Sequence, residues 1–366
     1  MLKKVMFHIN SLGKGGAERV VANLSKEFVK KNIAVVVATE WEAKDEYPLE
    51  EKVSRLGVGL SEEEEALPGA TKRKLRKKRL REAILREKPD VVYSFCRNAN
   101  YRAVMAASGT KVPVIISVRS DPNVDYASAK QKIISAYLYG KAAGAVFQTP
   151  DARDFFPGFV AKKSTVIINP LHEKYLGRGI SKERRKAIVS VGRFHEAKDQ
   201  LVLIKAFELL MPDYPEYRLE FYGDASEDNT IAMVKEYIAS HRLKDRVILK
   251  GGSDSLEKDI FDAAVFVLSS KYEGMPNALM EAMALGLPVV STDCPCGGPA
   301  SLIRDGENGL LVKVGDAEEM AAAIKKYLDH PEKAEELGRE AALIQTKAAP
   351  DAVAQSWISY AEKIMK

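Results

Sequence analysis

Short apolar runs alternate along this chain with longer stretches in which apolar residues recur at helical spacing. The apolar runs occupy residues 5–9, 34–39, 91–95, 114–118 and 145–148, and then 188–192, 219–222, 247–250, 265–269 and 289–291. Nearly continuous apolar strands separated by amphipathic helices are typical of parallel sheets that are covered on both faces. The pattern therefore predicts an α/β fold with two doubly wound, Rossmann-like domains.

The boundary between these domains is expected where proline, glycine and charged residues interrupt the pattern. Pro170, Gly177 and Gly179 fall in such a stretch, and a chain of 366 residues exceeds what one hydrophobic core usually supports. We expect a first domain over residues 1–170 and a second over 171–349. The remaining segment, 350–366, has the apolar spacing of a final helix.

The segment from Lys271 to Pro288 carries the strongest chemical signal. Glu273 is followed by Gly-Met-Pro-Asn and then by an apolar stretch that ends at a Gly-Leu-Pro sequence. Proline is favoured in the first turn of a helix, and glycine and proline end one, so a helix is predicted from near Pro276 to Leu285. The amino end of such a helix can bind a phosphate.

Glu281 is predicted to lie within this helix among apolar residues. A carboxylate is rarely buried there without a partner. Hydroxyl groups of a ligand would satisfy it, and the alternative is pairing with an arginine of the neighbouring domain.

Two further segments follow predicted strands and contain groups suited to phosphate. Arg193 offers a planar fork of donors and Lys198 a compact positive charge, although both could instead pair with surface carboxylates. The glycine turn at residues 13–19, with Gly15 and Gly16, would let backbone approach a ligand. Glu18 breaks the dinucleotide-binding spacing, and the turn lacks the end of a Walker loop.

Together, Glu273, the Gly-Met-Pro-Asn sequence and Glu281 resemble the signature of the retaining family 4 glycosyltransferases, two glutamates separated by seven residues. Residues 291–303 and 305–312 resemble the same family. The resemblance implies the GT-B arrangement, in which the two domains face each other across a cleft and the carboxy-terminal helix crosses back onto the first domain.

The resemblance also implies roles for individual residues. Arg193 and Lys198 would hold the donor diphosphate, Glu273 the hydroxyls of the donor sugar and Glu281 those of the ribose. The donor-binding set would further include Gly15, Gly16, Gly274, Met275, Pro276 and Asn277. Many relatives place a histidine at the end of a first-domain strand, where this chain has Arg119 and Asp121 instead. We expect Arg119 to take part in catalysis there.

The implied function is retaining transfer of a hexose or an N-acetylhexosamine from a nucleotide-diphosphate sugar, here a UDP-sugar, to a saccharide or lipid-linked acceptor in surface glycan synthesis. The donor is a substrate, so no cofactor is expected. No metal is expected either, because the chain lacks an Asp-x-Asp motif. The alternatives are a sugar-nucleotide epimerase, a phosphorylase, or a non-catalytic nucleotide-sugar binding protein.

Charge adds a possible membrane partner. The net charge is only +5, but residues 71–88 are strongly cationic with a few leucines on one helical face. Such a helix suits an anionic membrane surface; the other interpretations are a solvated face or a nucleic-acid patch, and no nucleic-acid-binding motif supports the last. Three cysteines and no long apolar run predict a cytoplasmic protein, peripheral on the inner face of the membrane.

Overall fold

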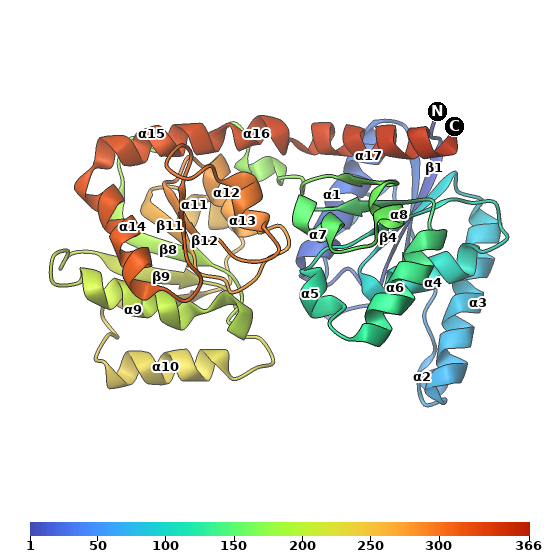
Figure 1. Ribbon diagram of the computed structural model, residues 1–366, viewed down its shortest axis with the longest axis horizontal. Coiled ribbons are helices and arrows are strands. Elements are labelled where there is room, and N and C mark those ends of the chain that lie inside the picture. Colours follow the sequence, from blue (N-terminus) through green and yellow to red (C-terminus); the bar gives the residue numbers. More distant parts are fainter. The chain divides into compact units, whose positions relative to one another are not determined.

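A computed structural model describes residues 1–366. The chain forms two compact units, Met1–Pro170 together with Pro350–Lys366, and Leu171–Ala349. Each unit contains one parallel sheet with helices packed against it (Figure 1). No helix combines the length and the apolar character needed to cross a membrane.

The first unit contains a seven-stranded sheet in the order β3-β2-β1-β4-β5-β6-β7. Its strands are β1 (Lys4–Ile9), β2 (Ala34–Thr39), β3 (Ser54–Gly57), β4 (Val91–Phe95), β5 (Val114–Ser117), β6 (Gly144–Phe147) and β7 (Ser164–Val166). All neighbours are parallel, so the carboxyl ends of the strands share one edge. The apolar pattern did not predict β3 and β7, because these edge strands are only partly buried.

Helices connect these strands. They are α1 (Gly16–Lys30), α2 (Glu62–Glu65), α3 (Gly69–Glu87), α4 (Arg97–Ala107), α5 (Pro122–Asp125), α6 (Ala129–Lys141), α7 (Pro150–Asp154), α8 (Gly158–Ala161) and α17 (Pro350–Met365). The helices α1, α3, α4 and α6 bury only one face each. They therefore cover the sheet as the amphipathic pattern predicts.

The carboxy-terminal helix α17 belongs to the core of the first unit. Trp357 is fully buried and stacks on Phe95 with ring centroids 5.4 Å apart. The Tyr93 hydroxyl donates a hydrogen bond to the Trp357 carbonyl at 3.0 Å, and the helix ends beside the chain's amino terminus (Figure 1). Tyr93 and Trp357 are 264 residues apart in the sequence. The last helix thus completes a core whose strands come from the start of the chain.

The second unit contains a six-stranded parallel sheet in the order β10-β9-β8-β11-β12-β13. Its strands are β8 (Arg185–Val191), β9 (Arg218–Tyr222), β10 (Val247–Gly251), β11 (Ala263–Leu268), β12 (Val289–Thr292) and β13 (Leu310–Val312). The order reverses between β8 and β11. In open α/β sheets ligands bind outside the carboxyl ends of the strands at such a reversal.

The helical elements of this unit flank its sheet. They are η1 (Glu173–Tyr175), η2 (Glu196–Lys198), α9 (Gln200–Leu210), α10 (Thr230–Ser240), α11 (Leu256–Asp259), α12 (Asn277–Ala284), α13 (Gly298–Leu302), α14 (Ala317–Asp329), α15 (Pro331–Ala342) and α16 (Ile344–Lys347). Residues from α9, α10 and α14 pack with the inward side chains of the strands in one apolar core. That core holds the loops after the strands at a common edge.

Candidate active site

The loops after β8, β9, β11 and β12 meet at the carboxyl edge of the second sheet. Gly192 directly follows β8 and Gly223 directly follows β9, and a Cβ at Gly223 would lie 2.1 Å from the Gly192 carbonyl oxygen. Gly223 also has φ of +145°, which side chains with a Cβ rarely adopt. Glycine at this position therefore lets the two strand ends approach closely beneath Arg193.

Lys198 and Glu273 form a salt bridge in this edge, and the two residues come from the loops after β8 and β11. The Ser270 hydroxyl donates a second hydrogen bond to the same carboxylate oxygen, Oε1, at 2.7 Å. The Glu273 side chain is 12% exposed. Sequence reasoning assigned both residues to a donor but missed their contact, because residues 75 positions apart carry no local signal of pairing.

The loop that carries Glu273 is fixed by the segment after β12. The Glu273 amide donates to the Pro295 carbonyl at 2.7 Å, and the Cys296 amide donates to the Glu273 carbonyl at 3.2 Å. A Cβ at Gly298 would lie 2.0 Å from the Gly274 carbonyl oxygen. The two sequence segments that resemble one family therefore form a single packed structure.

The predicted helix after Gly274 is confirmed as α12, Asn277–Ala284. Pro276 is its N-cap residue and provides no side-chain cap, and Gly286 follows the helix with φ of +67°. Glu281 is 4% exposed on this helix. The structure thus places a buried carboxylate one turn inside a helix whose amino end follows the Glu273 loop.

Arg193 is exposed at the same edge and forms no salt bridge. Its carbonyl accepts a hydrogen bond from the Gln200 side chain at 2.9 Å, which fixes the backbone while leaving the guanidinium outward. Nearby, the Gly252 amide donates to Asp224 at 3.0 Å and joins the loops after β9 and β10. An unpaired guanidinium beside a lysine is suited to bind a diphosphate.

The glycine turn lies after β1 in the first unit. Gly15 is the N-cap of α1 and the helix begins at Gly16. The Gly15 amide donates to the Gly13 carbonyl at 2.6 Å. No side chain caps this helix, so Gly15 and Gly16 present backbone at the carboxyl edge of the first sheet.

Arg119 lies at that edge too, just after β5. Its guanidinium donates to Asn169 Oδ1 and to the Ser117 hydroxyl, and it stacks over the Phe95 ring. Burial lowers the pKa of Arg119 to about 10, and the charge of Glu18 partly opposes that shift. The side chain therefore remains cationic at neutral pH.

Asp121, which sequence reasoning offered beside Arg119, has a structural role. It is the N-cap of α5, and its carboxylate accepts from the Asn123 amide at 2.9 Å. Gln148 contributes instead, because its side-chain amide donates to Asn169 Oδ1 at 2.8 Å. Arg119, Asn169 and Gln148 thus form a polar cluster that only the sheet topology brings together.

The cationic segment forms α3, but part of its charge is neutralised by the unit itself. Arg76 pairs with Glu65 and with the buried Glu40, and Arg79 pairs with Glu64. The acidic run that precedes the helix therefore folds back onto it. Exposed residues without a salt bridge remain on the helix, namely Arg73, Lys74 and Lys77.

The fold is that of known GT-B structures. Over 99% of this chain and 100% of the other, it matches Anabaena HepE crystallised with UDP, with a TM-score of 0.81 and 17% identity. Over 99% of both chains it matches sucrose-phosphate synthase from Thermosynechococcus elongatus, with a TM-score of 0.82 and 17% identity. At this identity the likeness concerns the fold.

Family models cover both units. Residues 14–172 match the model "Glycosyltransferase Family 4", and residues 173–343 match "Glycosyl transferases group 1". The chain thus contains a domain of the glycosyltransferase family 4 type followed by a domain of the glycosyl transferases group 1 type.

Two relatives illustrate the range of its matches. The chain is 27% identical over 342 residues to N-acetylgalactosamine-N,N'-diacetylbacillosaminyl-diphospho-undecaprenol 4-alpha-N-acetylgalactosaminyltransferase of Campylobacter jejuni, covering 90% of this chain and 91% of the relative. It is 32% identical over 201 residues to an exopolysaccharide phosphotransferase of Streptomyces coelicolor, covering 55% of this chain. The chain spans only 21% of the Streptomyces relative.

Proposed function

We propose that this protein transfers a hexose or N-acetylhexosamine from a UDP-sugar to a saccharide or lipid-linked acceptor with retention of anomeric configuration. The observation that carries the proposal is the Lys198–Glu273 pair beside the unpaired Arg193, at the carboxyl edge of the second sheet. Two comparisons support it. The Campylobacter relative is named for a transfer onto a diphospho-undecaprenol-linked sugar, and HepE was crystallised with UDP.

The donor diphosphate binds between cationic groups in this proposal. Arg193 contacts phosphate oxygens with its fork of donors, Lys198 supplies a point charge, and the amino end of α12 contributes its dipole. Entry of the diphosphate draws Lys198 from Glu273 toward phosphate. The Glu273 carboxylate, still held by Ser270, then accepts hydrogen bonds from hydroxyls of the donor sugar.

Gly274, Met275, Pro276 and Asn277 form the wall beside the diphosphate in this proposal, and Glu281 accepts hydrogen bonds from the ribose hydroxyls. A buried carboxylate can accept from two neighbouring hydroxyls at once. These roles rest on the resemblance to the family signature, together with the burial of Glu281 on α12.

The reaction breaks the bond between the anomeric carbon and the diphosphate oxygen. The acceptor hydroxyl forms the new bond on the same face, and its proton passes to the departing diphosphate. Negative charge grows on that diphosphate in the transition state, so the fixed charges of Arg193 and Lys198 lower the barrier. No metal enters these steps.

Residues of the first unit serve the acceptor. The cationic Arg119, oriented by Asn169 and Ser117, attracts an anionic group such as the phosphate of a lipid-linked saccharide. Gly15 and Gly16 allow close approach of the backbone to the reacting groups. The exposed cations of α3 bind an anionic membrane, which places the enzyme on the inner face of the cytoplasmic membrane.

The decisive experiment measures release of UDP from UDP-hexoses and UDP-N-acetylhexosamines with an undecaprenyl-diphosphate-linked saccharide as acceptor. Acceptor-dependent release, with NMR of the product showing the donor's anomeric configuration, is expected. Release that depends on inorganic phosphate would identify a phosphorylase. Tight UDP binding without turnover across this panel would favour a binding protein, and an inverted product would overturn retention.

A further inference from the structure

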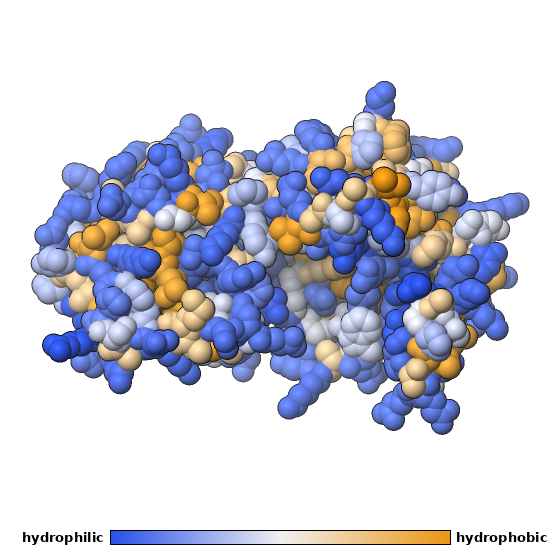
Figure 2. All heavy atoms as spheres, turned by 60° about the horizontal axis from the view of Figure 1, so that its bottom comes forward, coloured by the Kyte–Doolittle hydropathy of each residue, from blue (hydrophilic) through white to orange (hydrophobic).

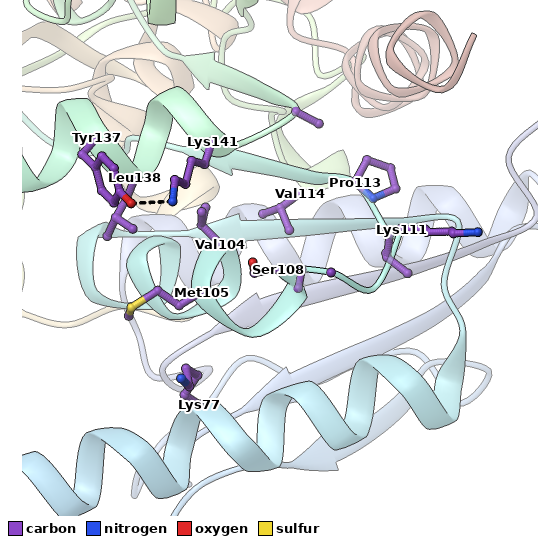
Figure 3. Close-up of a pocket in the computed structure, with 14 residues that line it drawn as sticks. Lys77, Val104, Met105, Ser108, Lys111, Pro113, Val114, Tyr137, Leu138 and Lys141 are labelled. Atoms are coloured by element: carbon purple, nitrogen blue, oxygen red, sulfur yellow. Dashed lines mark hydrogen bonds between the residues drawn. The ribbon is translucent and has the colours of Figure 1, made fainter.

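A pocket of about 580 Å³ lies in the first unit at the edge opposite Arg119. It is enclosed by α3, α4, α6 and the start of β5 (Figure 3). Val114 opens β5 at the pocket, whereas Arg119 follows the other end of that strand. Four strand residues span about 13 Å, so the pocket is separate from the proposed acceptor side.

The floor of the pocket is apolar and its rim carries exposed apolar side chains. Val104 and Leu138 are buried in its lining, while Met105 is 44% exposed and Tyr137 is 61% exposed. Ile133, 70% exposed, lies four residues before Tyr137 and so on the same face of α6. On a surface where hydrophobic residues are scattered among hydrophilic ones (Figure 2), this grouping marks a contact site for an apolar chain.

Three lysines from three elements line the pocket; Lys77 and Lys141 lie on the side of Met105 and Leu138, whereas Lys111 points away from them (Figure 3). Lys77 comes from α3, Lys111 from the turn before β5, and Lys141 from the end of α6. No Asp or Glu lines the pocket, and none of the three lysines forms a salt bridge. Lys141 contacts only a neutral group, the Tyr137 hydroxyl and ring (Figure 3).

These lysines are not needed to neutralise the helix ends at the pocket. The last carbonyls of α4 are met by Arg81, which donates to Ala106 at 2.9 Å and to Ser108 at 2.6 Å. Lys163 donates in the same way to the Gly140 and Ala142 carbonyls at the end of α6. Each helix end carries only about half a negative charge, so the ammonium groups of Lys77 and Lys141 remain for an external anion.

We propose that this pocket binds an anionic membrane phospholipid, with the phosphate between Lys77 and Lys141 and the upper acyl chain along Val104, Met105 and Leu138. An anion with an attached apolar chain complements both parts of the lining. The proposal deepens the membrane docking of the proposed function and rests on it. In addition to the general attraction between the cations of α3 and an anionic membrane, it assigns one phospholipid to a defined pocket.

The test titrates the full-length protein with six-carbon phosphatidylglycerol below its micelle concentration and follows binding by calorimetry. Phosphatidylcholine of equal chain length and inorganic phosphate are the comparison probes. We expect phosphatidylglycerol to bind at least tenfold more tightly than either. Equal binding of phosphate alone, or no binding of phosphatidylglycerol, would overturn the lipid site.

Matched variants locate the site. The pair Lys77→Gln and Lys141→Gln is expected to weaken phosphatidylglycerol binding at least tenfold. The control pair Lys130→Gln and Lys162→Gln, two exposed lysines outside the lining, changes it less than twofold. An equal loss of phosphatidylglycerol affinity in both double variants would mean that net charge, and not this pocket, determines binding, and would overturn the proposal. UDP affinity and turnover are measured in parallel on the same protein. Lipid binding without sugar transfer would contradict the proposed transferase function but support the lipid site.

Discussion

Glu273 has two partners at one carboxylate oxygen, the charged Lys198 and the neutral Ser270. Glutamine preserves the shape of the side chain and can keep the Ser270 contact through its carbonyl, but it removes the negative charge. Glu273→Gln is therefore expected to lower kcat about 100-fold, the scale found for single groups that act in a transition state, while UDP affinity changes less than threefold. Steady-state kinetics and calorimetry with UDP separate the two effects.

The control for this experiment is the other partner. Ser270→Ala keeps the charge of Glu273 and removes one hydrogen bond to its carboxylate, which contributes about 1.5 kcal/mol, so it should reduce turnover about tenfold, less than Glu273→Gln does. A Glu273→Gln enzyme with unchanged kcat would contradict the proposed contact with donor hydroxyls.

His8 makes the stability of the first unit depend on pH. It is fully buried between Ser94 and Glu40, and burial first, then the charge of Arg102, lowers its pKa from 6.5 to about 3. Glu40 alone would raise the pKa, but Arg102 pairs with Glu40 and offsets its charge. The imidazole is therefore neutral in the folded protein at neutral pH.

Because the unfolded chain protonates His8 near pH 6.5 and the folded chain only near pH 3, stability is full above pH 6.5 and decreases below it. Between pH 7.5 and 5 the free energy of unfolding should fall by about 2 kcal/mol through this residue. Urea unfolding of His8→Asn should show a correspondingly shallower pH dependence. His330→Asn, at an exposed position, should keep the wild-type dependence, and identical slopes for His8→Asn and wild type would contradict the assignment.

At the scale of elements, α3 combines anchoring and free cations on one helix. Arg76 and Arg79 hold it to Glu40, Glu64 and Glu65, while Arg73 and Lys74 are exposed without a salt bridge. The double variant Arg73→Gln, Lys74→Gln should weaken binding to phosphatidylglycerol vesicles about 30-fold, since each cation near an anionic surface contributes about 1 kcal/mol. Vesicle cosedimentation measures it.

Thermal unfolding provides the matched control for α3. Arg73→Gln, Lys74→Gln should leave Tm within about 2 °C, because exposed charges contribute little to stability. Arg76→Gln should lower Tm clearly, since it removes a partner of the buried Glu40. Unchanged vesicle binding in the double variant would exclude this helix from membrane docking.

At the scale of the whole molecule, the last helix, α17, completes the first unit although it follows the second in sequence. Trp357 packs on Tyr93 and Phe95. Trp357→Ala should destabilise that unit by about 3–5 kcal/mol, the usual effect of removing a buried aromatic ring. Calorimetric unfolding should then show a transition of the first unit at a lower temperature than in the wild type. Above that temperature the second unit should still bind UDP. A single unshifted transition would contradict this prediction.

The local sequence determined much of this protein. Strands of continuous apolar residues and the helix from Asn277 could be predicted, because apolar periodicity and helix-ending residues act over a few positions. The signature that includes Glu273 and Glu281 was visible only as a resemblance to a known family. Edge strands such as β3 and β13 were not predicted, since a partly buried strand needs no continuous apolar run.

Only the tertiary structure decided which distant groups meet. The Lys198–Glu273 pair, the Arg119–Asn169–Gln148 cluster, the contact of Arg76 on α3 with the buried Glu40 and the lysine-lined pocket all join segments that the sheet order brings together. Their charges are visible in the sequence, but electrostatic pairing depends on distance and burial. Those two quantities are set by strand order and by helix packing, neither of which a local pattern contains.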